Sequence, residues 1–223
     1  MTSTLPRRLA GLIITGTVLV ALAGCTDPGT PSTASPPAAT PAASSAATGC
    51  PTSQPSALGA GETRTVTMET EKGTIIIKLE ADLSPIATGN FAALAGCGYY
   101  DGVVFHRTAT LQDGTPFVIQ GGDPTGTGSG GPGYEIQDEP VTALYGRGTV
   151  AMARTAAPNS VGSQFFIVLD DADRDVLASA NTYQIIGTVT SGMEVADAIY
   201  AASNGEEVPA DPVAMTTVTV ANP

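Results

Sequence analysis

Along residues 74–79, Ile75, Ile77 and Leu79 fall on one face of an extended chain, and Thr74, Ile76 and Lys78 fall on the other. An apolar residue at every second position is typical of a half-buried β-strand, because successive side chains of a strand point to opposite faces. Other short apolar runs recur along the chain, bounded by turn-forming residues. We expect a strand in each of them: Thr65–Thr70, Val103–Arg107, Phe117–Gly121, Thr149–Ala153, Phe165–Leu169, Gln184–Val189 and Met215–Val220.

Two segments have the signals of helices. Ser84 and Pro85 provide an N-cap and a proline at the first helical position, and an apolar stripe continues to Gly96. Ser191–Glu194 has the spacing of a capping box, and Asn204-Gly205 ends the helix that follows it. Together the elements predict a mainly β domain, a closed eight-stranded antiparallel β-barrel capped by two α-helices. A β-sandwich would give the same pattern, so the pattern alone does not separate the two.

The beginning of the chain has the pattern of an export signal. Arg7 and Arg8 precede a short apolar stretch, Leu9–Ala23, which is too short to span a membrane comfortably as a helix. It ends in Leu22-Ala23-Gly24-Cys25, which resembles the bacterial lipobox, where the chain is cut before a cysteine that receives a diacylglyceryl group. The resemblance implies a lipoprotein signal peptide at 1–24 and lipidation of Cys25. The alternative is a plain signal peptide followed by an unmodified cysteine.

A low-complexity segment follows. From residue 26 to residue 60 every position is Pro, Ala, Ser, Thr or Gly except Asp27, Cys50, Gln54 and Leu58. Such a stretch cannot bury enough apolar surface to offset the entropy of ordering it, and its prolines keep it extended. We therefore expect residues 25–61 to be a disordered tether that holds a folded domain, residues 62–223, away from a membrane.

The charge of the chain excludes several partners. The chain has 9 Lys and Arg residues against 21 Asp and Glu residues, a formal net charge of −12. An acidic surface repels nucleic acids and anionic lipids, so we expect no nucleic-acid partner and contact with a membrane only through the lipid anchor.

Few residues could hold a metal or a cofactor. The chain has one histidine and three cysteines, which leaves a structural zinc site nearly out of reach. The glycine-rich stretch Gly126–Gly133 lacks the Gly-Lys-Ser/Thr of a phosphate loop and is interpreted as a surface loop. Asp171, Asp173 and Asp175 begin like a calcium loop, but Val176 and Thr182 stand where Gly and Glu are needed, so we expect solvated carboxylates. We predict no metal and no cofactor.

The cysteines allow two hypotheses. Cys97 and His106 could form a thiol enzyme, although nothing near them in the sequence supports it. If Cys25 is lipidated, Cys50 and Cys97 are the remaining pair, and export favours oxidation. A Cys50–Cys97 disulfide is therefore a hypothesis, and it would attach the end of the tether to the domain.

Several motifs occur together in a fixed order, and together they resemble the cyclophilin family of peptidyl-prolyl cis-trans isomerases. The resemblance covers residues 62–220. It rests on the following strings: Val104–Arg107, Phe117–Asp123, Gly131–Tyr134, Asp138-Glu139, Gly148–Ala153 and Asn159–Ile167.

The resemblance implies a role for individual residues. Arg107, in Phe-His-Arg, would be the hydrogen-bond donor to the prolyl nitrogen. The other residues that the resemblance implies for catalysis are Phe117, Gln120 and Phe166. Those that it implies for substrate binding are Val118, Ala153, Arg154, Gln164, Leu177 and Tyr183.

Strand periodicity adds an expectation about orientation. Gln164 and Phe166 are two residues apart, as are Phe105 and Arg107, so each pair would share a face. His106 would then point away from Arg107, into the barrel, as a packed structural histidine.

This sequence departs from the family pattern at four places. Val118 stands where many members have methionine, and Tyr183 replaces a common histidine. No aromatic residue occurs between Asp173 and Thr182, where the family has a pocket tryptophan. Finally, the link Thr108–Pro116 is longer than usual, and we assign no role to it.

These observations predict a monomeric, membrane-tethered, extracytoplasmic prolyl isomerase that acts on proline-containing peptides and unfolded exported proteins. The alternative is a cyclophilin-like peptide-binding or holdase module with weak or no isomerase activity, which the missing tryptophan would favour.

Overall fold

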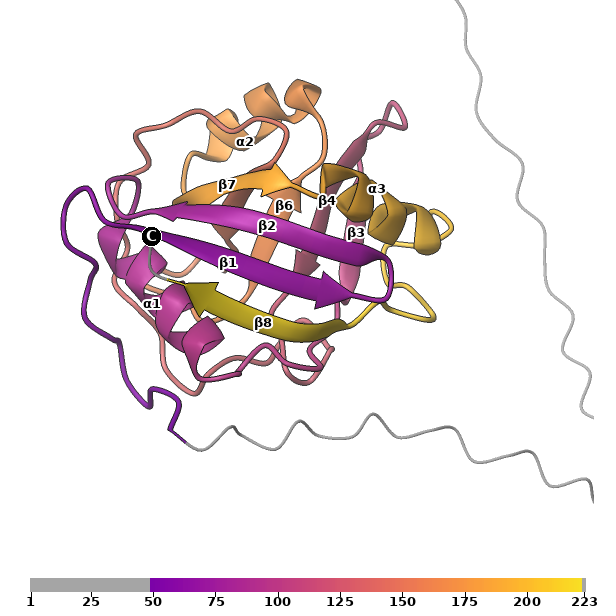
Figure 1. Cartoon of the computed structure of the whole chain (residues 1–223). Helices are drawn as coiled ribbons and strands as arrows, with labels where there is room; N and C mark the ends of the chain where they lie inside the picture. The colour runs from indigo at the N-terminus through magenta and orange to yellow at the C-terminus, as the bar shows by residue number, and fades with distance from the viewer. Residues whose placement is uncertain (1–48, 222–223) are drawn as a thin grey trace, which may run out of the picture. The chain divides into compact units, whose positions relative to one another are not determined.

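The computed structural model describes residues 49–221, in which eight strands form one sheet and three α-helices pack around it (Figure 1). The predicted signal peptide, Cys25 and the tether up to residue 48 lie outside the described residues. The strands are β1 (Thr63–Thr70), β2 (Gly73–Glu80), β3 (Arg107–Thr110), β4 (Pro116–Gly121), β5 (Thr149–Met152), β6 (Phe165–Val168), β7 (Ile185–Ser191) and β8 (Met215–Ala221). The helices are α1 (Pro85–Gly96), α2 (Arg174–Ala180) and α3 (Met193–Ala202).

The sheet is antiparallel throughout, with the order β3-β4-β6-β5-β7-β2-β1-β8. It curls so that β1, β2 and β8 lie in front of β3, β4 and β6 in Figure 1. Its two ends are joined by the residues that precede β3 and β8. Val104 forms a bridge with Ala214, and the amide of Phe105 donates to the carbonyl of Val213 at 2.9 Å. The predicted eight-stranded antiparallel architecture is confirmed, and a sandwich of two sheets is excluded.

The two faces of the sheet bury different apolar clusters. Ile119 of β4 and Ile167 of β6 are in register and belong to the larger cluster, inside the curl. Val118 and Val168, also in register, belong to a smaller cluster on the outer face, which includes Leu177 of α2. Because neighbouring residues of a strand point to opposite faces, β4 and β6 contribute to both clusters. The smaller cluster is the one beside the candidate site.

The described residues form three α-helices rather than the two predicted, and α2 is the additional one. The side chain of Asp170 accepts from the amide of Ala172 at 2.8 Å, and the Asp173 carboxylate accepts from the amide of Asp170 at 3.1 Å. These reciprocal bonds cap a 3-10 turn, Asp171–Asp173, that continues into α2.

The prediction that Asp171, Asp173 and Asp175 are solvated carboxylates is wrong for Asp173, because this residue is fully buried. Within residues 49–221 no group of His, Cys, Asp or Glu side chains is arranged to hold a metal ion.

The ends of the other helices also differ from prediction. Ser84 does not cap α1 with its side chain; its hydroxyl donates to the Leu83 carbonyl instead. The carboxylate of Glu139 caps α1, accepting from the amides of Ile86 and Ala87 at 2.9 Å each. A carboxylate suits this position, because the free amides and the dipole make a helix N-terminus positive.

The predicted capping box of α3 is wrong as well. Its N-cap is Gly192, in the left-handed region at φ 89°, and no side chain caps the helix. A Cβ at Gly192 would lie 2.2 Å from the carbonyl oxygen of Thr74, so close packing against β2 requires glycine here.

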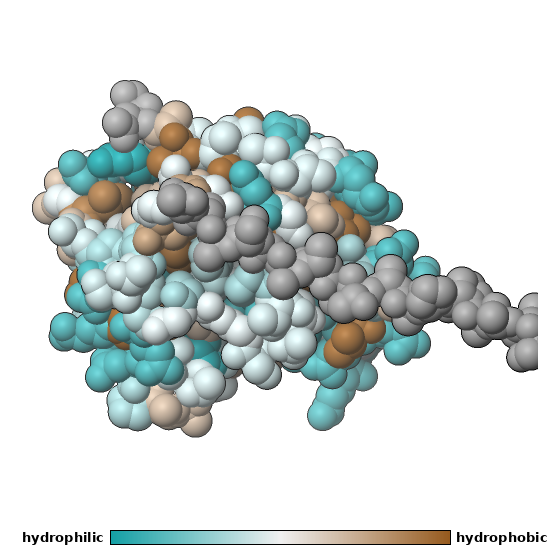
Figure 2. All heavy atoms as spheres, turned by 90° about the horizontal axis from the view of Figure 1, so that it is seen from below, coloured by the Kyte–Doolittle hydropathy of each residue, from teal (hydrophilic) through white to brown (hydrophobic). Residues whose placement is uncertain are grey.

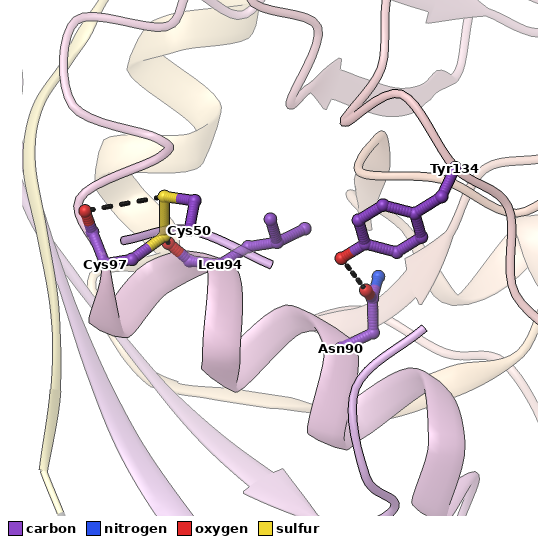
Figure 3. The surroundings of a disulfide bond; sticks show 5 residues. All are labelled: Cys50, Asn90, Leu94, Cys97 and Tyr134. Atoms are coloured by element: carbon purple, nitrogen blue, oxygen red, sulfur yellow. Dashed lines mark hydrogen bonds between the residues drawn. A yellow bond between two sulfur atoms is a disulfide. The ribbon is translucent and has the colours of Figure 1, made fainter. Parts of the chain in front are cut away.

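A disulfide joins Cys50 to Cys97, just after α1, with a Cα–Cα distance of 5.2 Å (Figure 3). Residues 51–61 then lie against the domain. The Leu58 amide donates to the carbonyl of Pro85 at 3.1 Å, and the Gln54 side chain accepts from the amide of Gln137 at 2.9 Å. A Cβ at Gly89 of α1 would lie 2.5 Å from the Ser56 carbonyl oxygen. The last part of the predicted tether therefore packs on the domain.

Helix α1 also holds the loops of the site. Tyr134 donates to the side-chain oxygen of Asn90 at 2.7 Å (Figure 3), and the Asn90 amide group donates to the Gly162 carbonyl at 2.8 Å. Burial raises the pKa of Tyr134 to about 12, so this phenol keeps its proton at neutral pH. None of the described helices is long and apolar enough to cross a membrane.

Candidate active site

Three strands bring the predicted catalytic residues to one face of the sheet. Arg107 of β3 pairs with Gln120 of β4, and Gln120 pairs with Phe166 of β6. Directly paired residues of antiparallel strands share a face, so the three side chains lie in a row across the outer face. Phe166 also pairs with Ala151 of β5, which belongs to the same outer apolar cluster.

A chain of hydrogen bonds orients the polar members of this row. Nη1 of Arg107 donates to Oε1 of Gln120 at 3.2 Å, and Nε2 of Gln120 donates to Oε1 of Gln164 at 2.9 Å. Gln164 in turn donates to the carbonyls of Gly128 and Gly130 at 2.9 and 3.0 Å. The guanidinium of Arg107 is thus held through two amides to the glycine-rich loop. That loop contributes backbone acceptors to the site.

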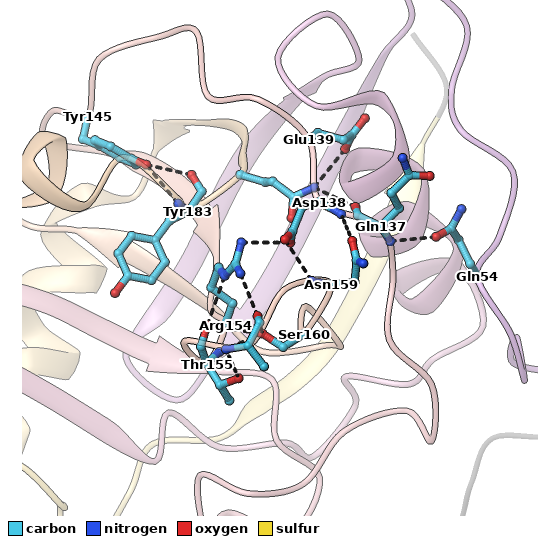
Figure 4. Close-up of polar contacts among 12 residues, drawn as sticks. Gln54, Gln137, Asp138, Glu139, Tyr145, Arg154, Thr155, Asn159, Ser160 and Tyr183 are labelled. Carbon is cyan, nitrogen blue, oxygen red and sulfur yellow. Dashed lines mark hydrogen bonds and ion pairs between the residues drawn. The ribbon is translucent and has the colours of Figure 1, made fainter.

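An apolar surface lies beside the row. Phe166 packs edge-on against Tyr183, with ring centroids 5.3 Å apart and an interplanar angle of 88°. The hydroxyl of Tyr145 fixes Tyr183 by donating to its carbonyl at 2.9 Å and accepting from its amide at 3.2 Å (Figure 4). The predicted residues that meet in this outer cluster are Phe117, Val118, Ala153, Phe166, Leu177 and Tyr183.

Arg154 was predicted to bind substrate, but its guanidinium is used within the protein. It forms an ion pair with Asp138 at 2.9 Å and donates to the carbonyl of Ala157 at 2.7 Å (Figure 4). Its side chain is only 11% exposed. Asp138 also exchanges two hydrogen bonds with Asn159. Arg154 therefore fixes the loop between β5 and β6, and what it offers a substrate is the wall that this loop forms.

Two cavities flank the row on opposite sides. The larger, about 760 Å³, lies between the glycine-rich loop and the loop after β5, and Gln120, Ala153 and Gln164 line its inner end. The smaller, about 420 Å³, is lined by Arg107, Phe117 and the beginning of the long link after Arg107. An extended peptide crossing the row would have a hollow on each side of its central residue.

The shared face predicted for Phe105 and Arg107 is wrong, whereas the burial predicted for His106 is confirmed. Phe105 is buried inside the barrel, with its ring centroid 6.1 Å from that of Phe165, whereas Arg107 lies on the outer face. The regular strand begins only at Arg107, so alternation does not extend back to Phe105. His106 is buried beneath the glycine-rich loop, where a Cβ at Gly128 would lie 3.8 Å from its Nε2.

His106 and Asp123 are neighbouring buried polar groups under this loop. Burial lowers the pKa of His106, with the Arg107 charge acting in the same direction and the Asp123 charge against it. Burial also opposes ionisation of Asp123, but the Gly130 amide and Thr125 donate to its carboxylate, and its net pKa is lowered. Asp123 thus organises the loop as a carboxylate. Cys97 is in the disulfide, so no Cys97–His106 thiol pair exists.

One residue beside Arg107 escaped the sequence analysis. Glu207, in the loop between α3 and β8, accepts from Nε of Arg107 at 2.8 Å and lies 2.8 Å from Nη2. The two residues are 100 positions apart, and a glutamate in an acidic loop carries no signal of its own. Tyr145 was also missed, because a lone tyrosine between Leu144 and Gly146 belongs to none of the recognised motifs.

The family comparison agrees with this geometry. The model of the cyclophilin-type peptidyl-prolyl cis-trans isomerase/CLD family matches residues 65–220, so the chain belongs to this family. It is a peptidyl-prolyl cis-trans isomerase.

Individual relatives give the same result. The chain is 45% identical over 135 residues to peptidyl-prolyl cis-trans isomerase ppi1 of Schizosaccharomyces pombe, covering 58% of this chain and 81% of the relative. It is 43% identical over 145 residues to isomerase CYP18-2 of Arabidopsis thaliana, covering 63% and 82%.

Solved structures confirm the fold. A crystal structure of a cyclophilin-type isomerase from Cryptosporidium parvum superposes with a TM-score of 0.62 and 32% identity, covering 72% of this chain and 99% of that one. A second structure of that protein, in the presence of the dipeptide Ala-Pro, gives a TM-score of 0.61 and 31% identity, with 71% and 99% covered.

Proposed function

We propose that this isomerase acts on X-Pro bonds of exported or unfolded proteins at the outer face of a cell membrane, with Arg107 as the catalytic donor. The observation that carries the catalytic part is the hydrogen bond from Arg107 to Gln120. This bond sets the guanidinium beside the apolar surface around Phe166.

The chemistry required is rotation without bond cleavage. The barrier of roughly 18–20 kcal/mol comes from amide resonance, which is lost when the bond is twisted. A catalyst needs neither a nucleophile nor a proton transfer, but it must bind the twisted amide better than either planar form. Twisting gives the prolyl nitrogen a lone pair that can accept a hydrogen bond.

Each part of the site has a place in this reaction. An arginine side chain carries a positive charge and a rigid fork of donors, so the guanidinium of Arg107 can donate to the prolyl nitrogen in the twisted state. The apolar side chains of Phe117, Val118, Phe166 and Leu177 can hold the proline ring while the rest of the chain turns. The hydrogen-bonded Gln120 keeps the donor oriented before the substrate arrives.

Isomerisation of a proline peptide by the purified protein and its variants tests this mechanism. Arg107→Ala should lose most of kcat/KM while the fold is retained. Arg147→Ala is a matched control, because both arginine side chains are 38% exposed and each pairs with a carboxylate, Arg147 with Asp197. Equal activity of the two variants would contradict the role of Arg107.

The location rests on two independent features. The motif Leu22–Cys25 resembles a lipobox, and Cys50 and Cys97 form a disulfide, a bond that persists in oxidising compartments outside the cytoplasm. In a bacterial host that processes lipoproteins, the full chain should incorporate labelled fatty acid and sediment with membranes. Cys25→Ser should lose both properties. Labelling that persists in the Cys25→Ser variant would contradict lipidation at Cys25.

The rival function is a binding or holdase module with little isomerase activity. It is favoured by α2, which has no aromatic residue where the family has a pocket tryptophan. Holdases need broad apolar surfaces. On the face seen in Figure 2, apolar residues form small patches among polar ones. Leu144, Val176 and Val208 are the exposed large apolar residues of the described chain. Binding of unfolded protein without any acceleration of proline isomerisation would favour the rival.

A further inference from the structure

The smaller cavity, of about 420 Å³, has no role in the mechanism above, although it opens directly beside the proposed donor. Arg107 and Phe117 form its inner wall, the first residues of the long link, Thr108–Gln112, form one side, and Gly205 and Glu207 form the other. The larger cavity meets the row at Gln120 and Gln164 instead. A substrate that places its proline against Phe166 and Phe117 would therefore extend a neighbouring residue into this smaller cavity.

The walls of the cavity are held in place by hydrogen bonds. The amide of Thr108 donates to the carbonyl of Glu207 at 2.9 Å, and its hydroxyl donates to the carbonyl of Glu206 at 2.7 Å. The hydroxyls of Thr110 and Tyr200 are 2.6 Å apart, which ties β3 to α3. These contacts fix the backbone on both sides, so the side chain of Glu207 projects from a rigid support.

Negative charge lies on one side of the cavity and on the loops beside it. Among its lining residues Arg107 is the cation and Glu207 the anion. Glu206 and Asp113, on the two flanking loops, are also acidic and exposed. The Glu207 side chain is 65% exposed, so a solvent-borne group can reach its carboxylate. A cationic side chain that enters on the side of Glu207 would be attracted to its carboxylate, whereas a carboxylate entering there would be repelled.

Glu207 also competes with the substrate for the donor. Its Oε1 accepts from Nε of Arg107 and lies 2.8 Å from Nη2, so the carboxylate partly neutralises the charge that should face the prolyl nitrogen. A lysine or arginine of the substrate that paired with Glu207 would weaken this hold. The guanidinium would then be freer to stabilise the twisted amide.

We propose that the smaller cavity is a subsite for a basic side chain flanking the substrate proline, with Glu207 as its specificity-determining residue. The proposal rests on the proposed role of Arg107. It gives the long link Thr108–Pro116 a function, since this link builds one wall of the subsite.

Two peptide sets test the proposal. One varies the residue after the proline and the other the residue before the X-Pro pair, each with Lys, Gln or Glu. Exposed ion pairs contribute about 0.2–1 kcal/mol, which corresponds to about 1.5- to 5-fold in kcat/KM. In one set, the protein should prefer Lys over Glu by a factor in this range, and the preference should shrink in high salt.

Variants at Glu207 make the test specific. Glu207→Gln should abolish the preference, Glu207→Lys should reverse it, and Glu207→Asp should keep part of it. Glu71→Gln is the matched control, because Glu71 is 63% exposed and pairs with Lys72 away from the site. Equal kcat/KM for the Lys, Gln and Glu peptides, or a preference that survives Glu207→Gln, would overturn the subsite. The Gln peptides carry no charge at the varied position, so their rate of isomerisation tests the proposed isomerase function independently of the subsite.

Discussion

Tyr145 and Tyr183 exchange two hydrogen bonds, in which the hydroxyl of Tyr145 donates to the carbonyl of Tyr183 and accepts from its amide. Tyr145 is buried, so the backbone of Tyr183 is satisfied by one side chain rather than by water. The bonds hold the Tyr183 ring edge-on against Phe166. A residue outside every recognised motif thereby sets the far wall of the apolar surface.

Tyr145→Phe should weaken both the fold and the site. The change leaves the amide and carbonyl of Tyr183 without their partner, which costs about 1–3 kcal/mol for a buried group. We expect a lower free energy of unfolding in urea titration and a higher KM for a proline peptide, with a smaller change in kcat. An unchanged KM alongside lost stability would show that Tyr183 does not need this support.

Glu139→Gln should destabilise the protein through α1. The two carboxylate oxygens of Glu139 each accept from a free amide of the helix N-terminus. A glutamine side chain has only one acceptor oxygen, so one of these hydrogen bonds would be lost. Loss of a charged cap costs about 0.5–2 kcal/mol in unfolding free energy. Glu194→Gln is the control, because Glu194 is also in the first turn of a helix but is exposed. Similar losses for the two variants would argue against the long-range cap.

His106 should make the fold less stable as the pH falls. Its pKa in the folded state is lowered from 6.5, mainly by burial, so the unfolded chain binds the proton more readily. The stabilising contribution of the neutral imidazole is complete above pH 6.5 and is lost as the pH falls through the folded pKa. Urea titrations at several pH values between 5 and 8 measure this slope. His106→Gln should remove this dependence of the unfolding free energy on pH. If the slope is unchanged in the variant, another titrating group causes it.

Asp173 should make the fold less stable as the pH rises, which is the opposite of the effect of His106. Burial raises its pKa from 3.8 to about 6, with the charges of Asp170, Asp113 and Asp171 adding to the effect. The folded state therefore retains a proton that the unfolded chain has lost, and stability falls as the pH rises from about 4 to 6. Asp173→Asn should raise the unfolding free energy by about 1–2 kcal/mol at pH 7.5 and have little effect at pH 4. If Asp173→Asn raised the unfolding free energy equally at pH 7.5 and at pH 4, the titration of Asp173 would be ruled out as the cause.

The parts of the fold that depend on local pattern could be predicted from the sequence. Ile75, Ile77 and Leu79 alternate as expected and are buried in β2. Helix α1 ends at Gly96 as predicted. The apolar residues assigned to the site meet in one cluster, because they lie on adjacent strands, directly beside the ends of strands, or on α2.

What failed depends on contacts between distant segments. The cap of α1 comes from Glu139, 53 residues after Ile86, and the partner of Arg107 comes from Glu207. The ion pair of Arg154 with Asp138 likewise joins segments that the sequence does not link. The periodicity argument at Phe105 failed because the chain there is not yet a regular strand, so its period of two does not apply.

The disulfide changes how the domain would respond to a pull on its N-terminal end. Tension applied before residue 50 passes through the sulfurs to Cys97 and continues along the chain from there. Everything between the two cysteines, including β1, β2 and α1, lies in a closed covalent loop and carries none of the force that is transmitted along the covalent chain. If the chain is anchored through Cys25, mechanical stress would bypass β1 and β2, and the elements after Cys97 would have to resist it.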